Sequence, residues 1–391
     1  MTTHIAVYAD WDGLSKPFRL GLLRGRLAGA REVFDFSFDR VAVDASVLGG
    51  VSLDPRIGFY EGPQYPPRDT DTFGVFADAS PDRWGRLLMR RRFEREQRAG
   101  RHKRARLNES DYLLGVHDTY RVGALRFRRD DTGPFLDNHH DLAAPPFVQL
   151  RELEAASLAL EQDEENMDQQ GDRWLRMLIA PGGSLGGARP KASVADPAGD
   201  LWIAKFPSAH DTHDIGGWEF VTQTLARAAG LRVPEGLARK FNSSHHTFMV
   251  QRFDRTASGR RLHFASAMTL TGHRDGDDGS TGVSYLELAR VLIEKGAQPR
   301  ADLLELWSRI VFNVLVSNAD DHLRNHGFML IPNAGWKLAD AYDVNPVPGA
   351  EGLKLNISEV DNARDLDLVR SVAPYFRVST RAAREVIVRI K

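Results

Sequence analysis

The sequence predicts an α+β fold in which sheet-rich segments precede a mostly helical C-terminal part. Strand-like apolar runs occur near the N-terminus and again at Leu201–Phe206 and Thr247–Phe253. From Asp302 to Val316, apolar residues recur at the spacing of one helix face, which predicts a core helix. Pro145–Pro146 predicts a linker between two units.

Two domains are therefore expected, at residues 1–145 and 146–391. The first is an α+β domain with short strands at Ile5–Tyr8, Val33–Phe38 and Val41–Val43, and with a helix that starts at Ser80 and Pro81 and reaches Gln97. The second has helices at Leu150–Glu161, at Trp218–Ala229 with Gly230 after its end, and at the C-terminus after a cap at Ser379 or Thr380.

Composition excludes several classes of site. The 391 residues carry a formal net charge of −1 and no cysteine, so disulfides, thiolate metal sites and cysteine nucleophiles are excluded. Net charge favours neither nucleic acid nor an anionic membrane as a partner. The N-terminus lacks the features of a signal peptide, and no apolar run approaches the roughly 20 residues of a membrane span. We expect a cytoplasmic protein.

The segment Ser317–Phe328 carries the strongest chemical signal. It places Asp320 five residues before Asn325, just after the predicted core helix. Phosphoryl transfer needs such a pair, namely a carboxylate near the attacking hydroxyl and an amide oxygen on a metal ion. His322 and His326 lie four residues apart, but the H-E-x-x-H zinc motif fails because Leu323 follows His322. Asp321 and His322 are expected to stabilise the loop by hydrogen bonding.

A glycine-rich segment, Pro181–Lys191, precedes this loop by more than a hundred residues. Glycines such as Gly186 and Gly187 let peptide N–H groups approach phosphate oxygens. Ala188 stands where a Walker A loop requires lysine, although Arg189 or Lys191 could reach phosphate. An ordinary flexible loop is the alternative.

Lys205 ends an apolar strand on the same face as Leu201 and Ile203, so it requires a partner. A kinase lysine pairs with the α- and β-phosphates and with a helix carboxylate, and Glu219 in the next helix is the candidate. A lysine whose stem lies along the strand end, with its ammonium group in water, is the alternative. Gln251 and Phe253 end the next strand, where backbone groups could meet an adenine edge or simply enter a surface turn.

Asp343 follows a predicted hairpin, Gly327–Ile331 and Trp336–Leu338, that returns the chain to the same cleft. A carboxylate there can bind Mg²⁺, which prefers oxygen ligands. Asp340 is the rival position.

The order of these motifs resembles the HipA family of bacterial serine/threonine kinases, the toxins of toxin–antitoxin pairs. The resemblance rests on the strings that run through Phe73–Phe76, Trp84–Leu88, Tyr112–Gly115, Gly123–Phe127, Gly186–Ala192, Gln251–Arg255 and Asn318–Asn325. It implies that Asp320 is the catalytic aspartate, Lys205 the ATP lysine, and Asn325 and Asp343 the Mg²⁺ ligands. The family's Tyr-Asp pair matches Tyr342-Asp343 and decides against Asp340.

The resemblance also implies that Ser184 is an autophosphorylation site and that a small helix-turn-helix antitoxin is a partner. Family targets include aminoacyl-tRNA synthetases. Gln251 departs from the glutamate often found at the hinge. The expected cofactor-binding residues are Ser184, Gly186, Gly187, Lys191, Lys205, Gln251, Phe253, His322, Asn325 and Asp343.

The predicted function is an ATP- and Mg²⁺-dependent protein serine/threonine kinase with a two-lobed, protein-kinase-like core and an appended N-terminal domain. A small-molecule or lipid kinase would use the same residues, and a non-catalytic corepressor bound to an antitoxin is the third possibility. The basic run Arg90–Arg106 is either a solvated helix end paired with Glu94, Glu96 and Glu109, or a contact with operator DNA in the antitoxin complex or with a tRNA-bound target.

Overall fold

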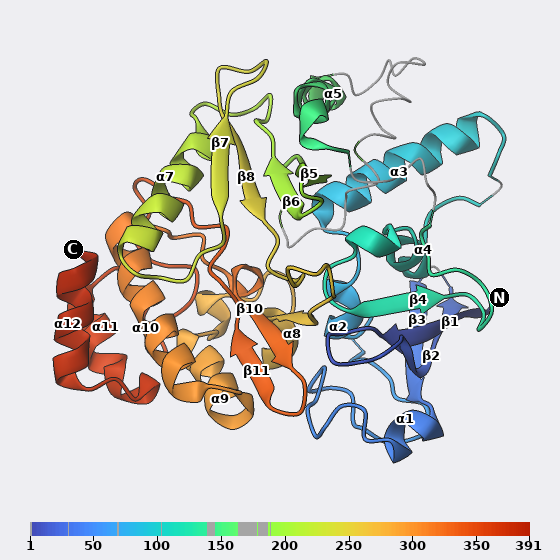
Figure 1. The fold of residues 1–391 in the computed structure, drawn as a ribbon, viewed down its shortest axis with the longest axis horizontal. Coiled ribbons are helices and arrows are strands. Elements are labelled where there is room, and N and C mark those ends of the chain that lie inside the picture. The colour runs from blue at the N-terminus through green and yellow to red at the C-terminus, as the bar shows by residue number, and fades with distance from the viewer. Residues whose placement is uncertain are drawn as a thin grey trace.

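The protein is described by a computed structural model that covers residues 2–29, 31–68, 70–102, 104–138, 145–162, 178, 187 and 189–391. Within these ranges the α+β class is confirmed. Three antiparallel sheets are distributed along the molecule, and the helices gather mainly toward the C-terminal part (Figure 1).

The first sheet has the strand order β3-β2-β1-β4 and is built from β1 (Thr2–Ala9), β2 (Phe18–Ala28), β3 (Arg31–Phe38) and β4 (Leu125–Arg128). The strand expected at Val41–Val43 is wrong, because these residues lie in the helix α1 (Arg40–Asp44), where Val41 is exposed and Ala42 is buried. Sequence reasoning missed β2, whose apolar residues are interrupted by arginine and glycine.

Three further helices belong to this region: α2 (Gly74–Asp78), α3 (Arg83–Arg98) and α4 (Glu109–Leu114). The helix expected from Ser80 begins later, because Asp82 caps α3 by accepting a hydrogen bond from the peptide N–H of Gly85. The Ser80 hydroxyl instead donates to the Phe76 carbonyl at the end of α2. An aspartate N-cap stabilises a helix start as well as serine does, so sequence alone did not separate the two.

The second sheet has the order β5-β6-β8-β7 and contains β5 (Lys191–Ala195), β6 (Leu201–Lys205), β7 (Gly236–Arg239) and β8 (Thr247–Gln251). Two helices accompany it, α5 (Leu150–Gln162) and α7 (Ile215–Ala228), both close to their predicted bounds. A compact core joins this sheet to α3 and α5 through Trp84, Leu88, Leu153 and Trp202.

The C-terminal part holds the third sheet, of order β11-β10-β9, built from β9 (Phe264–Ser266), β10 (Gly327–Ile331) and β11 (Gly335–Leu338). Its helices are α8 (Ala267–Thr271), α9 (Tyr285–Lys295), α10 (Pro299–Val316), α11 (Leu366–Val372) and α12 (Thr380–Ile390). The predicted core helix, hairpin and Ser379 cap are confirmed. In the described ranges, no helix is both long enough and apolar enough to cross a membrane.

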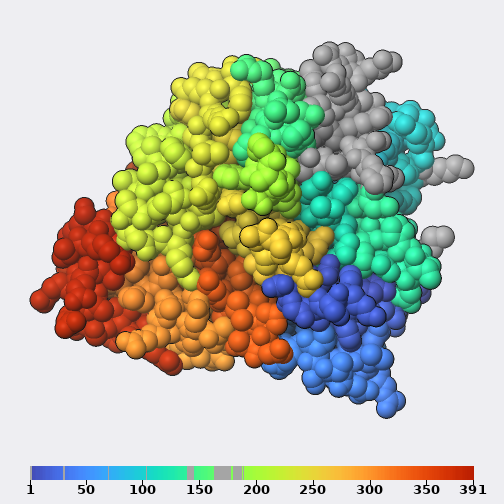
Figure 2. Space-filling model, viewed as in Figure 1, coloured from blue at the N-terminus to red at the C-terminus, as the bar shows by residue number. Residues whose placement is uncertain are grey.

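Short 3-10 turns complete the fold at Asp118–Tyr120, Phe147–Gln149, Gly279–Thr281, Leu323–Asn325 and Ala373–Phe376. One hydrophobic core runs without interruption from the first sheet into the helical part. It joins Trp11 and Phe76 to Leu270, Trp307 and Trp336. Figure 2 shows the same contact at the surface, where the blue N-terminal residues meet the orange ones near residue 330.

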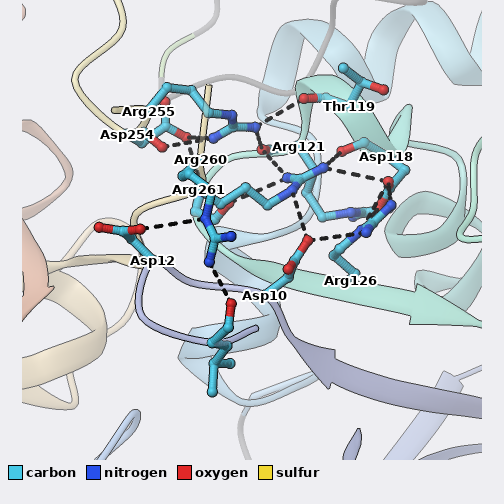
Figure 3. Close-up of polar contacts among 12 residues, drawn as sticks. Asp10, Asp12, Asp118, Thr119, Arg121, Arg126, Asp254, Arg255, Arg260 and Arg261 are labelled. Atoms are coloured by element: carbon cyan, nitrogen blue, oxygen red, sulfur yellow. Dashed lines mark hydrogen bonds and ion pairs between the residues drawn. The ribbon is translucent and has the colours of Figure 1, made fainter. Parts of the chain in front are cut away.

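Buried ion pairs also connect the N-terminal residues to the segment after β8 (Figure 3). The Asp254 carboxylate accepts from Arg252 and Arg255, each at 2.7 Å, and from the peptide N–H of Gly123 at 2.9 Å. Both side chains of the Arg252–Asp254 pair are completely buried. Burial opposes ionisation of Asp254, but the two arginines more than offset it, so the pKa of Asp254 lies below its usual range.

Arg261 extends this buried cluster toward the first sheet. Its guanidinium group contacts the Asp118 carboxylate at 3.4 Å, and Arg126 links Asp118 to Asp10 at 3.1 Å. Because each arginine reaches across a boundary between distant segments, the cluster fixes the first sheet against the segment after β8.

We expect Asp254→Asn to lower the free energy of unfolding by about 3 kcal/mol, because two buried arginines would lose their counter-charge. Asp254 has a lowered pKa, so its contribution is present above about pH 4 and is lost only as pH falls well below it. Urea unfolding at neutral pH measures the loss. Asp367→Asn, which removes one partner of an exposed pair, is the control and should change stability by less than about 0.5 kcal/mol. Equal stability of both variants would contradict the role of the cluster.

Candidate active site

Lys205 lies between two carboxylates at the end of β6. Its Nζ is 2.5 Å from Oε1 of Glu219 and 2.6 Å from Oδ1 of Asp343. Glu219 comes from α7, and Asp343 follows β11. The predicted pairing of Lys205 with Glu219 is therefore present, and Asp343 rather than Asp340 reaches the lysine.

The three groups share one partly buried site, in which the Glu219 side chain is 4% exposed and that of Asp343 is 29% exposed. Burial favours neutral Lys205, but Asp343 and Glu219 more than offset this and raise the pKa of Lys205. Burial raises the pKa of Glu219 despite the attraction of Lys205. Burial also acts to raise the pKa of Asp343, but the attraction of Lys205, assisted by Lys191 and His322, outweighs burial and lowers that pKa.

The loop that follows α10 brings Asp320 and Asn325 together. Ser317 ends the helix in the left-handed conformation, with φ of 59°. Asp320 is exposed, and Asn325 is buried in a 3-10 turn. The Asn325 Nδ2 donates to the Asp320 carbonyl at 3.1 Å, whereas its Oδ1 finds no donor in the part of the chain that the structure describes.

The buried Asp321 carboxylate fixes this loop by accepting hydrogen bonds. Its Oδ2 accepts from the Tyr285 hydroxyl at 2.6 Å, from Asn313 Nδ2 at 2.7 Å and from His326 Nε2 at 2.8 Å. Burial opposes the charge, but His326 and the hydrogen bonds lower the pKa of Asp321. The expected stabilising role of Asp321 is confirmed, and His326 is committed to this network. His322 stabilises the loop through its backbone, whose N–H donates to the Asp320 carbonyl at 3.0 Å and whose carbonyl accepts from the Asn325 N–H at 2.9 Å. Its side-chain Nδ1 is buried without a hydrogen bond to any described residue.

Asp343 is fixed to the same loop by its neighbours in sequence. Asp343 itself has φ of 59°, an uncommon conformation for a residue other than glycine. The Tyr342 hydroxyl donates to the Arg324 carbonyl at 2.8 Å, and the Asn345 N–H donates to Asn318 Oδ1 at 3.2 Å. These bonds place the carboxylate of Asp343 near the Asp320–Asn325 loop.

A cleft of about 440 Å³ opens beside Asp320. Its lining includes Gly187 and His322, together with residues that sequence reasoning did not select: Arg83, Met268, Arg274, Asp275, Gly276, Asp277, Leu323, Arg324 and Lys354. Leu323 and Arg324 lie within the Asn318–Asn325 motif, whereas the others come from helix starts and from loops distant in sequence that no local motif marks.

Lys191, predicted to bind phosphate, is buried and pairs with Asp82 at 2.9 Å. A Cβ on Gly187 would lie 3.0 Å from the Lys191 Nζ, so the loop end and this lysine are adjacent. Sequence reasoning missed Asp82 as the partner because it lies 109 residues away, in the N-terminal part. Ser184 and Gly186 lie outside the described residues.

Gln251 and Phe253 lie at the end of β8 and just beyond it. The peptide N–H groups of Gln251 and Arg252 donate to the Glu235 and Leu201 carbonyls, each at 2.9 Å. They are therefore not available to an adenine edge. The ring of Phe253 packs against that of Tyr342, with centroids 5.5 Å apart. Phe253 therefore contacts the residue that directly precedes Asp343.

In the basic run, Arg92 pairs with Glu96 at 3.0 Å, as the solvated-helix alternative predicted. Glu109 pairs with Arg86 at 2.7 Å, outside the run. Arg91 donates to the Leu160 carbonyl at 2.5 Å and so contacts α5. Several of these arginines thus serve internal contacts.

Comparison with known proteins identifies the family of this site. Residues 183–391, more than half of the chain, match the HipA-like C-terminal domain. The chain belongs to this family. The match contains all of Lys205, Glu219, Asp320, Asn325 and Asp343, so the cluster described above lies within the HipA-like domain.

Two curated relatives match part of the chain. A Haemophilus influenzae protein named "Putative kinase" is 29% identical over 154 residues, which cover 36% of this chain and 45% of the relative. A Sinorhizobium fredii protein named "Putative kinase Y4dM" is 32% identical over 174 residues, which cover 40% of each. The chain therefore aligns with less than half the length of these relatives.

The HipA-like fold extends beyond the matched domain. A chain in the Shewanella oneidensis MR-1 toxin–antitoxin complex of HipA, HipB and operator DNA superposes with a TM-score of 0.65 at 17% identity. The superposition covers 99% of this chain and 88% of that one. At this identity the likeness establishes the fold.

We expect Lys205→Met to lower the free energy of unfolding by about 3 kcal/mol at pH 8, because two carboxylates would lose their shared cation. Glu219 has a raised pKa, so acidification protonates it and relieves the repulsion. The loss should therefore be smaller at pH 5 than at pH 8, as measured by urea unfolding.

The double variant Lys205→Met with Glu219→Gln provides the control. Removing the buried negative charge of Glu219 should recover most of the stability lost at pH 8. A double variant that is less stable than Lys205→Met would refute this account of the site.

Proposed function

We propose that this chain is an ATP- and Mg²⁺-dependent protein serine/threonine kinase of the HipA type. The observation that carries the proposal is the convergence of Lys205, Glu219 and Asp343 beside the loop of Asp320 and Asn325. This set supplies a phosphate-binding cation held by a helix carboxylate, a carboxylate for the acceptor hydroxyl, and oxygen ligands for a metal ion.

Each residue has a role that its surroundings support. Asp320, exposed in the cleft, orients the acceptor hydroxyl and takes its proton. Lys205, kept charged by its raised pKa, holds the phosphates in line and offsets their charge. Glu219 keeps the lysine in position. Gly187, Lys191, Phe253 and His322 complete the nucleotide-binding surface in this proposal.

The residues present fit Mg²⁺, which prefers oxygen ligands. Asn325 offers a buried amide oxygen that no described donor satisfies, and Asp343 offers a carboxylate with a lowered pKa. A metal ion bound there would offset negative charge on the transferred phosphoryl group. Asn325 and Asp343 would hold the ion next to the phosphates.

In architectural terms, the sheet β5-β6-β8-β7 with α7 would form the N-lobe, and α9 to α12 the helical C-lobe. Residues 1–145 would form the appended domain. Asp82 and Lys191 would then connect that domain to the N-lobe.

We further propose a role as the toxin of a toxin–antitoxin module. The likeness to a HipA chain that is held with HipB and operator DNA supports a small helix-turn-helix antitoxin as partner, with DNA contacted only through that complex. The substrate would be a serine or threonine in a cytoplasmic protein, such as an aminoacyl-tRNA synthetase.

Asp320→Asn and Asp343→Asn should each abolish phosphoryl transfer while leaving the fold intact. Loss of the proton acceptor costs about 10²–10⁴-fold, and loss of the metal ligand should cost a comparable factor. Transfer of a radiolabelled γ-phosphate in single-turnover assays measures the rates. Asp340→Asn, three residues before Asp343, is the matched control and should retain activity. Near-normal rates in either test variant would refute the assignment.

Ser184 should become phosphorylated when the protein is incubated with Mg-ATP. A phosphate adds about −1.5 to −2 charges, so it would repel nucleotide from the neighbouring glycine-rich loop. Mass spectrometry after long incubation checks the modification, with Asp320→Asn protein as the control. Absence of phosphate from Ser184 in an otherwise active preparation would exclude this site.

A further inference from the structure

A second cleft, of about 430 Å³, adjoins the one that contains Asp320. Five residues line both: Arg83, Met268, Arg274, Asp275 and Arg324. The two clefts therefore form a continuous surface that leads away from Asp320. Neither Lys205 nor Asp343 lines these clefts, although Gly187 and His322, two other residues of the proposed nucleotide-binding surface, line the first one.

The walls of the second cleft come from two parts of the chain. One wall contains Thr70 before α2, Gly74 at its start and Pro81 before α3. The other wall contains His273 and Arg324 from the C-terminal part. An Arg83–Asp275 ion pair of 2.9 Å connects the walls where the two clefts meet. An opening formed between two parts of the chain, and lined by polar side chains, suits an extended polypeptide.

Most cations along this surface already have a counter-charge. Four of them form ion pairs: Arg83 with Asp275, Arg86 with Glu109 at 2.7 Å, Arg56 with Asp54 at 3.1 Å and Lys354 with Asp278 at 3.3 Å. His273 contacts Glu287 at 2.8 Å, and Arg274 also has an interaction partner. These groups are already compensated before any ligand arrives.

Arg324 differs from them. Its guanidinium group forms no hydrogen bond or ion pair within the described ranges. Burial raises the pKa of the nearby Asp78, and Arg324 opposes this only in part, after the hydrogen bonds that the carboxylate accepts from Ser266 and Thr269. The Arg324 backbone is fixed, because its carbonyl accepts from Tyr342 and the residue lies in the 3-10 turn before Asn325.

We propose that Arg324 binds an acidic side chain that flanks the acceptor hydroxyl, and that the acceptor is a polypeptide segment lying along the joined clefts. The inference rests on the proposed kinase function and adds the acidic flank of the acceptor and the residue that recognises it. Arg324 is four residues after Asp320, and both line the same cleft, so its charge acts next to the reacting hydroxyl. A guanidinium group binds carboxylate through two parallel hydrogen bonds, which gives direction as well as strength.

The same chemistry would suit the γ-phosphate of ATP. The second cleft favours the carboxylate, since Arg324 also lines this opening, which is lined by neither Lys205 nor Asp343. If Arg324 bound the nucleotide instead, its substitution would weaken ATP binding and leave peptide binding unchanged. The test therefore measures peptide binding and nucleotide binding separately.

The probes are fluorescein-labelled peptides in which a central serine is flanked on each side by two Glu, two Gln or two Lys residues. Binding is measured by fluorescence anisotropy on full-length Asp320→Asn protein, so that no turnover occurs. The Glu peptide should bind about 10-fold or more tightly than the Gln peptide, as expected for a hydrogen bond between charged groups.

Arg324→Gln in this background should remove the preference for the Glu peptide, and Arg324→Glu should transfer it to the Lys peptide. Arg381→Gln on α12 is the matched control, because it removes an arginine that is 89% exposed and outside both clefts, and it should keep the preference. Equal affinity for the Glu and Gln peptides, or a preference that survives Arg324→Gln, overturns the inference.

Nucleotide binding by Arg324→Gln protein should be unchanged. A 10-fold loss of ATP affinity with unaltered peptide preference would instead make the γ-phosphate the ligand and overturn the inference. With Asp320 restored, the Glu peptide should also show the lower KM for phosphoryl transfer. If the peptide preference depends on Arg324 but no transfer occurs, the docking surface stands and the proposed kinase function fails.

Discussion

The ion pairs of Lys205 are the constraint on which the rest of the site depends. One ammonium group lies within 2.6 Å of two carboxylates that come from α7 and from the turn after β11. In a buried site, charges of this kind interact strongly, and separating them without another partner is costly. The pairs therefore fix three elements relative to one another: the end of β6, the start of α7 and residue 343. They also leave one net negative charge, since two acids share one cation, and such a site is suited to receive a further cation.

The position of Asp320 depends on a second, independent constraint. Asp321 accepts three hydrogen bonds, from α9, from α10 and from His326 just before β10, and it does so directly beside Asp320 in the chain. Its buried negative charge keeps the loop closed on the core, whereas its neighbour remains exposed to the cleft. Asp321 thus anchors the loop to the core, whereas the adjacent Asp320 faces the cleft. Asn318 then connects the loop to Asn345, so the loop and the turn of Asp343 cannot shift separately without breaking hydrogen bonds.

Sequence reasoning could predict those parts of the fold that local pattern determines. The apolar spacing of α10, the hairpin of β10 and β11, and the strand of Lys205 are all encoded within short windows, and Glu219 lies one connection away. The errors fall where a choice depends on distant partners. A three-residue run such as Val41–Val43 fits a strand or a helical turn equally well until packing decides. Asp82 resembles an ordinary helix cap, and only the assembled structure places it against Lys191. Neither composition nor periodicity predicts buried ion pairs such as Arg252–Asp254.

The Lys205 site and the second cleft are held by different means, and in the proposed enzyme the first serves nucleotide recognition and the second acceptor recognition. The Lys205 side is fixed by ion pairs among the sheet, α7 and the turn of Asp343. The second cleft has one wall from the N-terminal part, so its width depends on the shared hydrophobic core and on the Arg–Asp cluster of Figure 3. Substitutions along the N-terminal wall can therefore alter which polypeptide is accepted without disturbing the ion pairs of Lys205. Arg324 lies at the boundary, since its backbone is bound to Tyr342 while its side chain faces both clefts. A single residue in the loop that carries Asp320 and Asn325 can thus couple the choice of acceptor to the geometry of transfer.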